Sequence, residues 1–175
     1  GRLLVVAGPE GRLLRQEPDG SLVDHADLSG LGAGLNEIVV DGRGRIYVNG
    51  GTDFHPGEGE APGFVALITP DGQVGRVAEG IAFPNGMAVT PDNSTLIVSE
   101  SFGGTLTAFD IGPDGSLSNR RTWAPLPGDG IVLDTDGAVW TPGWTETGPA
   151  CLRVAEGGEV LDTVPLDRAG FACTL

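Results

Sequence analysis

Short apolar runs separated by polar turns extend along the whole 175-residue chain. Within residues 65–69 and 106–110 the side chains alternate between two faces, as they do in short β-strands. Such runs are followed by Pro-Asp-Gly at 18–20, 70–72 and 113–115 and by Glu-Gly-Gly at 156–158. These turns favour hairpins because Pro presets φ and Gly tolerates a positive φ. No stretch has a helical period, so the pattern predicts an all-β chain.

A longer phrase recurs three times: a polar Asn or Asp, a short apolar strand, an Asp/Gly turn and a second apolar strand. Its copies begin at Asn36, Asn85 and Asp129, roughly 45 residues apart, which is about the length of one four-stranded β-propeller blade. We expect these residues to begin the innermost strands of successive blades and to point toward one axis. Residues 1–175 would then form a single β-propeller segment of about four blades, without the N-terminal and C-terminal blades of a larger ring.

The composition agrees with a folded, turn-rich protein. The chain has 30 Gly and 13 Pro, yet 39% of its residues are hydrophobic, which is enough to bury a core. Its net charge is −14 and every basic residue is Arg. The negative electrostatic field of such a charge repels nucleic acids and anionic membranes, so we expect neither as a partner. No segment has the pattern of a signal peptide or a membrane span, which favours a cytoplasmic location.

Several segments resemble the gluconolactonase / senescence marker protein / luciferin-regenerating enzyme family, and the resemblance runs from residue 1 to 175. The most specific part is Pro84-Asn85-Gly86 followed one blade later by Asp129-Gly130. The other matching segments are Asn36-Glu37 with Val40-Asp41, Leu133-Asp134, Gly157-Gly158-Glu159-Val160 and Phe171-Ala172-Cys173. The resemblance implies a propeller that is six-bladed in the full-length family. It also implies one divalent metal in the central channel, and hydrolysis of sugar lactones or related cyclic esters.

Carried over by this resemblance, Asn85 and Asp129 match metal ligands, and Asp129 also matches the proposed general base. Asn36 matches a residue that faces the metal and the substrate. We also expect Asp53, in the acidic loop from 49 to 63, to lie at the channel mouth and to contact the substrate. The resemblance makes Ca²⁺ the expected metal, with Mg²⁺, Mn²⁺ and Zn²⁺ as alternatives.

The residue types fit this chemistry independently of the family. An amide oxygen at Asn85 and a carboxylate at Asp129 are hard ligands that suit Ca²⁺ or Mg²⁺, and the sequence has no His/Cys cluster that would select zinc. A cation there could polarise an ester carbonyl while Asp129 accepts a proton from water. The alternative is that Asn and Asp only cap the turns that lead into the strands.

The chain departs from the family pattern at three points. The family's first metal ligand is a Glu in a Glu-Gly-Pro segment, and Glu10 is not a substitute because Gly8-Pro9-Glu10 has the wrong order and falls in a hairpin. Glu37 stands where the family usually has Asp, and Gly34 stands where many sugar lactonases have a substrate-binding Arg. The last two changes argue against gluconolactone itself as the substrate.

Two function classes follow. The first is a metal-dependent hydrolase of a small-molecule lactone or cyclic ester. The second is a non-catalytic or differently catalytic small-molecule-binding propeller, because a fold does not fix a function. A Ser-His-Asp hydrolase is disfavoured because no Gly-x-Ser-x-Gly motif occurs and the only histidines are His25 and His55. Cys151 and Cys173 are expected to be free thiols, with a disulfide as the alternative. The sequence makes no prediction of oligomeric state.

Overall fold

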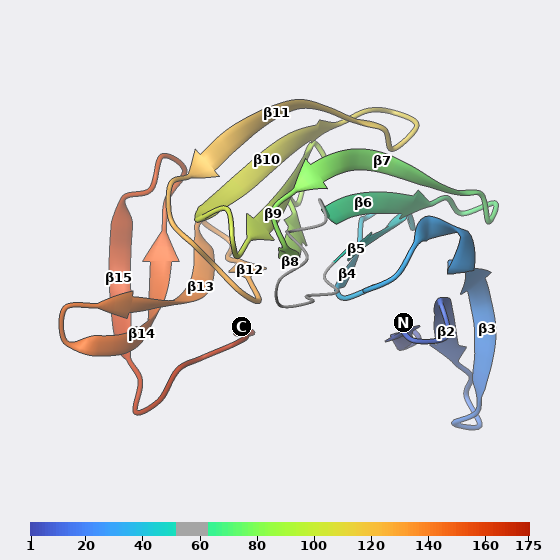
Figure 1. Ribbon diagram of the computed structural model, residues 1–175, viewed down its shortest axis with the longest axis horizontal. Coiled ribbons are helices and arrows are strands. Elements are labelled where there is room, and N and C mark those ends of the chain that lie inside the picture. The colour runs from blue at the N-terminus through green and yellow to red at the C-terminus, as the bar shows by residue number, and fades with distance from the viewer. Residues whose placement is uncertain (52–62) are drawn as a thin grey trace, which may run out of the picture.

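The computed structural model describes residues 1–51 and 63–175, which form four antiparallel sheets in chain order (Figure 1). The first sheet contains β1 (Leu4–Ala7), β2 (Arg12–Gln16) and β3 (Leu22–Asp27), and a 3₁₀ turn, η1 (Ser29–Leu31), follows it. The second contains β4 (Ile38–Val40), β5 (Ile46–Gly50), β6 (Gly63–Ile68) and β7 (Val74–Ile81). The third contains β8 (Pro84–Val89), β9 (Thr95–Glu100), β10 (Thr105–Ile111) and β11 (Leu117–Ala124). The fourth contains β12 (Val132–Leu133), β13 (Val139–Thr145), β14 (Gly148–Val154) and β15 (Val160–Pro165).

The four sheets are arranged as blades around a common centre, with the two chain ends directed toward the middle (Figure 1). In the second, third and fourth sheets each strand pairs with the next in sequence, from an inner strand (β4, β8 or β12) to an outer one (β7, β11 or β15). The predicted all-β propeller architecture is therefore confirmed. The first sheet differs from the expected four-stranded blade because it has three strands among the described residues.

The predicted turns join the strands as expected. The three Pro-Asp-Gly turns connect β2 to β3, β6 to β7 and β10 to β11, and Glu156-Gly157-Gly158 connects β14 to β15. At the first of them, the Asp19 carboxylate accepts hydrogen bonds from the Ser21 N–H at 3.0 Å and the Ser21 hydroxyl at 2.6 Å. Asp114 and Ser116 repeat this pattern. The aspartate therefore stabilises the turn locally, and the Asp residues of the Pro-Asp-Gly turns have a structural role and do not belong to a functional site.

The hydrophobic core lies between the sheets. One cluster joins the first and second sheets, a second joins the second and third through Tyr47 and Phe109, and a third joins the third and fourth through Ile97 and Val139. All residues of β5 and β6 are buried, since neighbouring sheets cover both faces of these strands. Burial in the middle strands therefore does not follow the simple alternation of a one-sided sheet.

A buried ion pair fastens the second sheet to the third. Arg45 Nε lies 2.6 Å from Asp41 Oδ2, and both side chains are almost fully buried. The Arg45 guanidinium also donates to the backbone oxygens of Gly112 at 2.9 Å and Pro113 at 3.2 Å, in the β10–β11 turn. These bonds fix how the third sheet lies against the second.

The segment after β15 returns toward the centre (Figure 1). There the Gly130 N–H donates to the Phe171 oxygen at 2.8 Å. Cys151 and Cys173 are free thiols, and the Cys173 thiol donates to the Trp140 oxygen at 3.2 Å. Burial, together with the nearby Cys151, raises the pKa of Cys173 to about 12. The described ranges contain no helix long and apolar enough to span a membrane.

Candidate functional site

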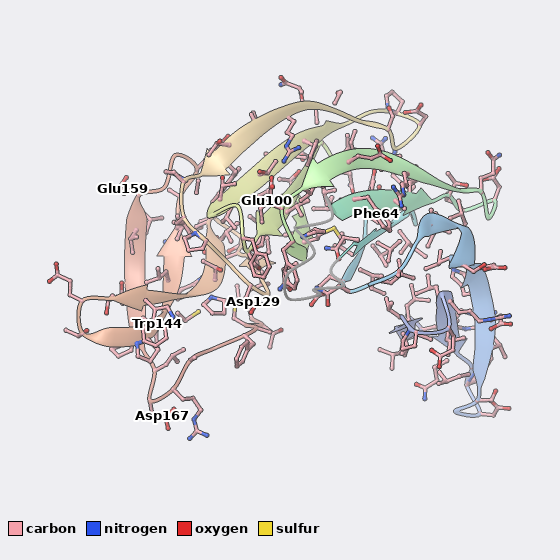
Figure 2. The ribbon with its side chains drawn as sticks, viewed as in Figure 1. Phe64, Glu100, Asp129, Trp144, Glu159 and Asp167 are labelled. Atoms are coloured by element: carbon pink, nitrogen blue, oxygen red, sulfur yellow. The ribbon has the colours of Figure 1, made fainter. Side chains whose placement is uncertain are left out.

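Three polar residues begin the inner strands of consecutive sheets, where the repeat places them. Asn36 precedes β4, Asn85 is the second residue of β8, and Asp129 precedes β12. Figure 2 shows Asp129 toward the middle of the molecule, whereas Glu159 lies at the outer side of the fourth sheet. The start of β12 thus faces the centre around which the sheets are arranged.

Hydrogen bonds connect these strand starts from one sheet to the next. The Asn36 Nδ2 group donates to the Pro84 oxygen at 3.4 Å, and the Gly86 N–H donates to the Asp129 oxygen at 3.0 Å. A Cβ added to Gly86 would lie 2.4 Å from the Ile131 nitrogen and 2.6 Å from the Asp129 oxygen. Only glycine permits this approach, which explains why the Asn-Gly dipeptide is needed at this strand start.

Asn85 and Asp129 form the centre of the site. The Asn85 side chain donates a hydrogen bond to the Asp129 carboxylate. Burial raises the pKa of Asp129, and this effect is only partly offset by the hydrogen bonds from the Gly130 backbone and from Asn85. The carboxylate is therefore held in place and is also more basic than an exposed aspartate.

Glu37 adds a second carboxyl group to this region. Its pKa is raised, first by burial and second by the negative charge of Asp129. The second effect requires the two carboxyl groups to be within electrostatic reach of each other. In the sequence Glu37 is recognised only as a departure from the family pattern, although its position next to Asn36 in the repeat is a signal that it faces the site.

Asn49 is a site residue that sequence reasoning missed. It is fully buried at the end of β5. Its Nδ2 group donates to the Asn85 oxygen at 2.6 Å, and its Oδ1 accepts from the Glu37 N–H at 3.0 Å. The Asn49 side chain thus links the backbone of Glu37 to the backbone of Asn85. The available signal was a polar residue at the end of an apolar strand, which is costly unless it is hydrogen bonded.

The approach to Asn85 contains an unusual backbone conformation. Phe83 has a φ of 56°, which non-glycine residues seldom adopt. Its oxygen accepts a hydrogen bond from the Ser101 N–H at 3.1 Å, and its ring stacks on Phe102 with centroids 4.2 Å apart. These contacts hold Phe83 in this conformation, so that Pro84 and Asn85 enter β8 in a fixed direction.

Other candidate residues lie apart from this centre or outside the described ranges. Asp53 lies outside the described residues, so its predicted substrate contact stays a prediction. Burial alone would raise the pKa of Glu100, but hydrogen bonds from Thr107, the Ala82 N–H and Arg120 outweigh it and lower the pKa. Glu100 is thus an internal structural carboxylate, with Arg120 at 2.7 Å.

The donor set fits a hard cation. Within residues 1–51 and 63–175, no group of three or more His, Cys, Asp or Glu side chains is arranged to hold a metal ion. The oxygen donors of this region are the carboxylates of Asp129 and Glu37 and the amide of Asn85, which are ligand types that suit Ca²⁺ or Mg²⁺. Both carboxylates have raised pKa values, so a nearby positive charge would favour their ionised forms.

Comparison with known proteins points to one family. The family described as "SMP-30/Gluconolactonase/LRE-like region" matches residues 1–175. Diisopropyl-fluorophosphatase of Loligo vulgaris is 28% identical over 160 residues, which are 81% of this chain and 51% of that protein. L-arabinolactonase of Azospirillum brasilense is 28% identical over 146 residues, which are 80% of this chain and 48% of that protein. The chain thus spans about half the length of these two relatives.

Solved structures give the same result for the fold. A gluconolactonase of Xanthomonas campestris superposes with a TM-score of 0.78 at 27% identity, over 99% of this chain and 61% of that chain. A luciferin-regenerating enzyme superposes with a TM-score of 0.72 at 21% identity, over 92% of this chain and 61% of that chain. At 21% identity the second similarity concerns the fold alone.

Proposed function

Because the chain belongs to the SMP-30/gluconolactonase/LRE-like family, we propose that the protein hydrolyses lactones or related small cyclic esters at the site formed by Asn85 and Asp129. The observation that carries the proposal is the hydrogen bond from Asn85 to a partly buried Asp129 whose pKa is raised. A general base is most effective when its pKa approaches the working pH, and burial shifts Asp129 in that direction. The similarity to a lactonase and a gluconolactonase supports this choice of reaction.

Asp129 acts as the base in this reaction. Its carboxylate accepts a proton from a water molecule while the water oxygen attacks the ester carbonyl carbon. The ring C–O bond then breaks, and the proton passes to the leaving oxygen, which gives a hydroxy acid. Asn85 holds the carboxylate in position by its hydrogen bond, and Asn49 holds the Asn85 backbone.

Asn85 and Asp129 are also the residues that would hold a divalent cation, with Glu37 as a nearby source of further negative charge. Since the Asn85 amide nitrogen donates to Asp129, its amide oxygen is the atom that would face a cation. When bound, the cation supplies Lewis-acid polarisation of the ester carbonyl. Ca²⁺ is the expected ion, and Mg²⁺, Mn²⁺ and Zn²⁺ are the alternatives.

Asn36 and Asp53 complete the proposal as substrate contacts. Asn36 lies at the start of the inner strand next to β8 and reaches the Pro84 backbone, so it is placed beside Asn85.

We propose a cytoplasmic protein in which further blades complete the ring.

A panel of lactones tests the proposed function. The full-length protein is assayed with and without a chelator and then with each of Ca²⁺, Mg²⁺, Mn²⁺ and Zn²⁺ added back. We expect hydrolysis of at least one lactone that the chelator abolishes and one cation restores. If the protein binds small molecules but opens no lactone with any cation, the second class predicted from the sequence, a non-catalytic or differently catalytic propeller, takes its place.

A further inference from the structure

A cavity of about 450 Å³ opens beside Asp129 on the fourth sheet. This volume lies within the range of small-molecule sites. Three stretches of chain form it: the approach to β12, the β13–β14 hairpin, and the segment after β15. Figure 2 shows Trp144 and Asp167 at the same end of this sheet, where that segment leaves β15.

The cavity wall is largely apolar. Asp129 is the only ionisable side chain among the described residues that line it. The walls include Leu126, Pro142, Trp144, Leu152 and Phe171. The Trp144 indole N–H is the only other polar side-chain group on this lining. A carboxylate at the edge of an apolar wall can act on a polar reacting group while the wall contacts an apolar one.

Two aromatic side chains of this wall are strongly exposed. Within residues 1–51 and 63–175, Trp144 is 70% exposed and Phe171 is 72% exposed, so a ligand in the cavity could cover apolar surface of both rings. Phe171 is tied to the site because its oxygen accepts the Gly130 N–H at 2.8 Å. Aromatic rings next to a carboxylate can contact the apolar part of a ligand that the carboxylate acts on.

The wall discriminates between two kinds of substrate. A polyhydroxylated sugar lactone would place several hydroxyl groups against carbon atoms that cannot hydrogen bond, and each unpaired polar group is costly to bury. An alkyl or aryl substituent would instead remove its own apolar surface and that of the two aromatic rings from water, which favours binding.

We propose that this cavity binds an apolar substituent of the substrate, so that the preferred substrates are alkyl- or aryl-substituted cyclic esters and not polyhydroxylated sugar lactones. The inference rests on the proposed lactone hydrolysis at Asp129 and names its substrate class. Trp144 is the specificity-determining residue, because it forms the exposed wall without belonging to the Asn85–Asp129 pair.

Matched lactones test the inference by kinetics. δ-Decalactone and δ-valerolactone share one ring and differ by an alkyl chain, and glucono-δ-lactone is the polyhydroxylated comparison. In the full-length protein with its activating cation, we expect kcat/KM for δ-decalactone to exceed that for each of the other two by at least about tenfold. Trp144→Ala should remove about tenfold of this preference, mainly through KM for δ-decalactone, while Trp144→Phe retains most of it.

Val40→Ala is the matched control, since Val40 is an exposed apolar residue of β4, in a sheet with described neighbours on both sides, and does not line the cavity. It should leave all three lactones unaffected. Equal or better turnover of glucono-δ-lactone, or a Trp144→Ala variant with an unaltered preference, would overturn the inference while the proposed function stands.

A binding measurement separates the two proposals. The lactams corresponding to δ-decalactone and δ-valerolactone are not hydrolysed under these conditions, and calorimetry gives their affinities. Tighter binding of δ-decalactam by at least about tenfold, lost in Trp144→Ala, supports the apolar cavity even if no lactone is opened, in which case only the proposed function fails. Equal affinities for the two lactams would overturn the inference whatever the activity.

Discussion

The side chain of Asn85 donates a hydrogen bond to the carboxylate of Asp129 although the two residues belong to adjacent sheets. The same two strand starts are joined by a backbone hydrogen bond of 3.0 Å from Gly86 to Asp129. The orientation of the proposed base is therefore set by the neighbouring blade. Substitutions at Asn85 or Asp129 should therefore change activity or cation binding while the fold is retained.

Asp129→Asn should keep the fold and remove the base. The two side chains have nearly the same shape, but the amide cannot accept the proton, so kcat/KM for a hydrolysed lactone should fall by at least ~100-fold. Steady-state kinetics of the full-length protein at saturating cation checks this. Asp114→Asn, in the β10–β11 turn, is the control and should retain activity. Near-normal turnover of Asp129→Asn would show that another group is the base.

Asn85→Ala should chiefly weaken cation binding. It removes the amide oxygen that would face the ion and the hydrogen bond that holds Asp129. We expect the cation concentration for half-maximal activity to rise by at least ~10-fold, in line with the loss of an interaction that orients a ligand. A titration of activity against cation measures this. Asn119→Gly, which preserves the positive φ at that exposed position, should not shift the titration, and an unshifted Asn85→Ala would remove Asn85 from the ligand set.

Asp41→Asn should destabilise the protein by about 3 kcal/mol, because it leaves the buried Arg45 without its counter-charge. Denaturant unfolding at neutral pH measures the loss. Asp24→Asn breaks an exposed pair with Arg12 and should cost less than about 1 kcal/mol. If the two variants were equally stable, the Arg45 pair would not fasten the sheets.

The same pair predicts a pH dependence. Burial disfavours the ionised form of Asp41, but hydrogen bonds from the Arg45 N–H, the Arg45 side chain and the Arg43 N–H outweigh it and lower the pKa below 3.8. A carboxyl group with a lowered folded pKa contributes stability above its unfolded pKa and loses it as the pH falls through the folded pKa. The difference in unfolding free energy between wild type and Asp41→Asn should therefore be full at neutral pH and shrink below pH 3.8. A difference that grows on acidification would contradict this assignment.

Cys173 should react slowly with alkylating reagents. With its pKa raised to about 12 by burial and by Cys151, the thiolate is only roughly 10⁻⁴ of the population at pH ~8. Peptide mass spectrometry after iodoacetamide treatment should show labelling of Cys173 more than ~100-fold slower in the native protein than in guanidinium. Rapid native labelling would mean that the segment after β15 does not bury this thiol.

The sequence predicts the elements that depend on local chemistry. The Pro-Asp-Gly turns lie at the expected hairpins because the aspartate and glycine stabilise them without distant partners. The repeat correctly places Asn36, Asn85 and Asp129 at inner strand starts, because the blade period fixes where each inner strand begins.

Features that depend on contacts between blades could not be predicted. Asn49 belongs to the site because its partners Glu37 and Asn85 come from two sheets, and no local pattern reports that pairing. The cavity next to Asp129 requires the approach to β12, the β13–β14 hairpin and the segment after β15 to meet. The free state of Cys151 and Cys173 was expected, but the hydrogen bond from the Cys173 thiol to the Trp140 oxygen depends on how that last segment packs.

The close approach at Gly86 makes the geometry of the site tolerant of sequence drift. Because Gly86 has no Cβ, its main chain lies directly against the main chain of Asp129 and Ile131, and this contact sets the separation between the starts of β8 and β12. Exchanging one core side chain for another leaves these main-chain atoms in place. The interiors of the blades can therefore accumulate volume-conserving substitutions while Asn85 and Asp129 keep their spacing. A lineage could then replace most of its hydrophobic residues and alter its substrate preference through the surrounding loops, yet inherit the same reacting pair.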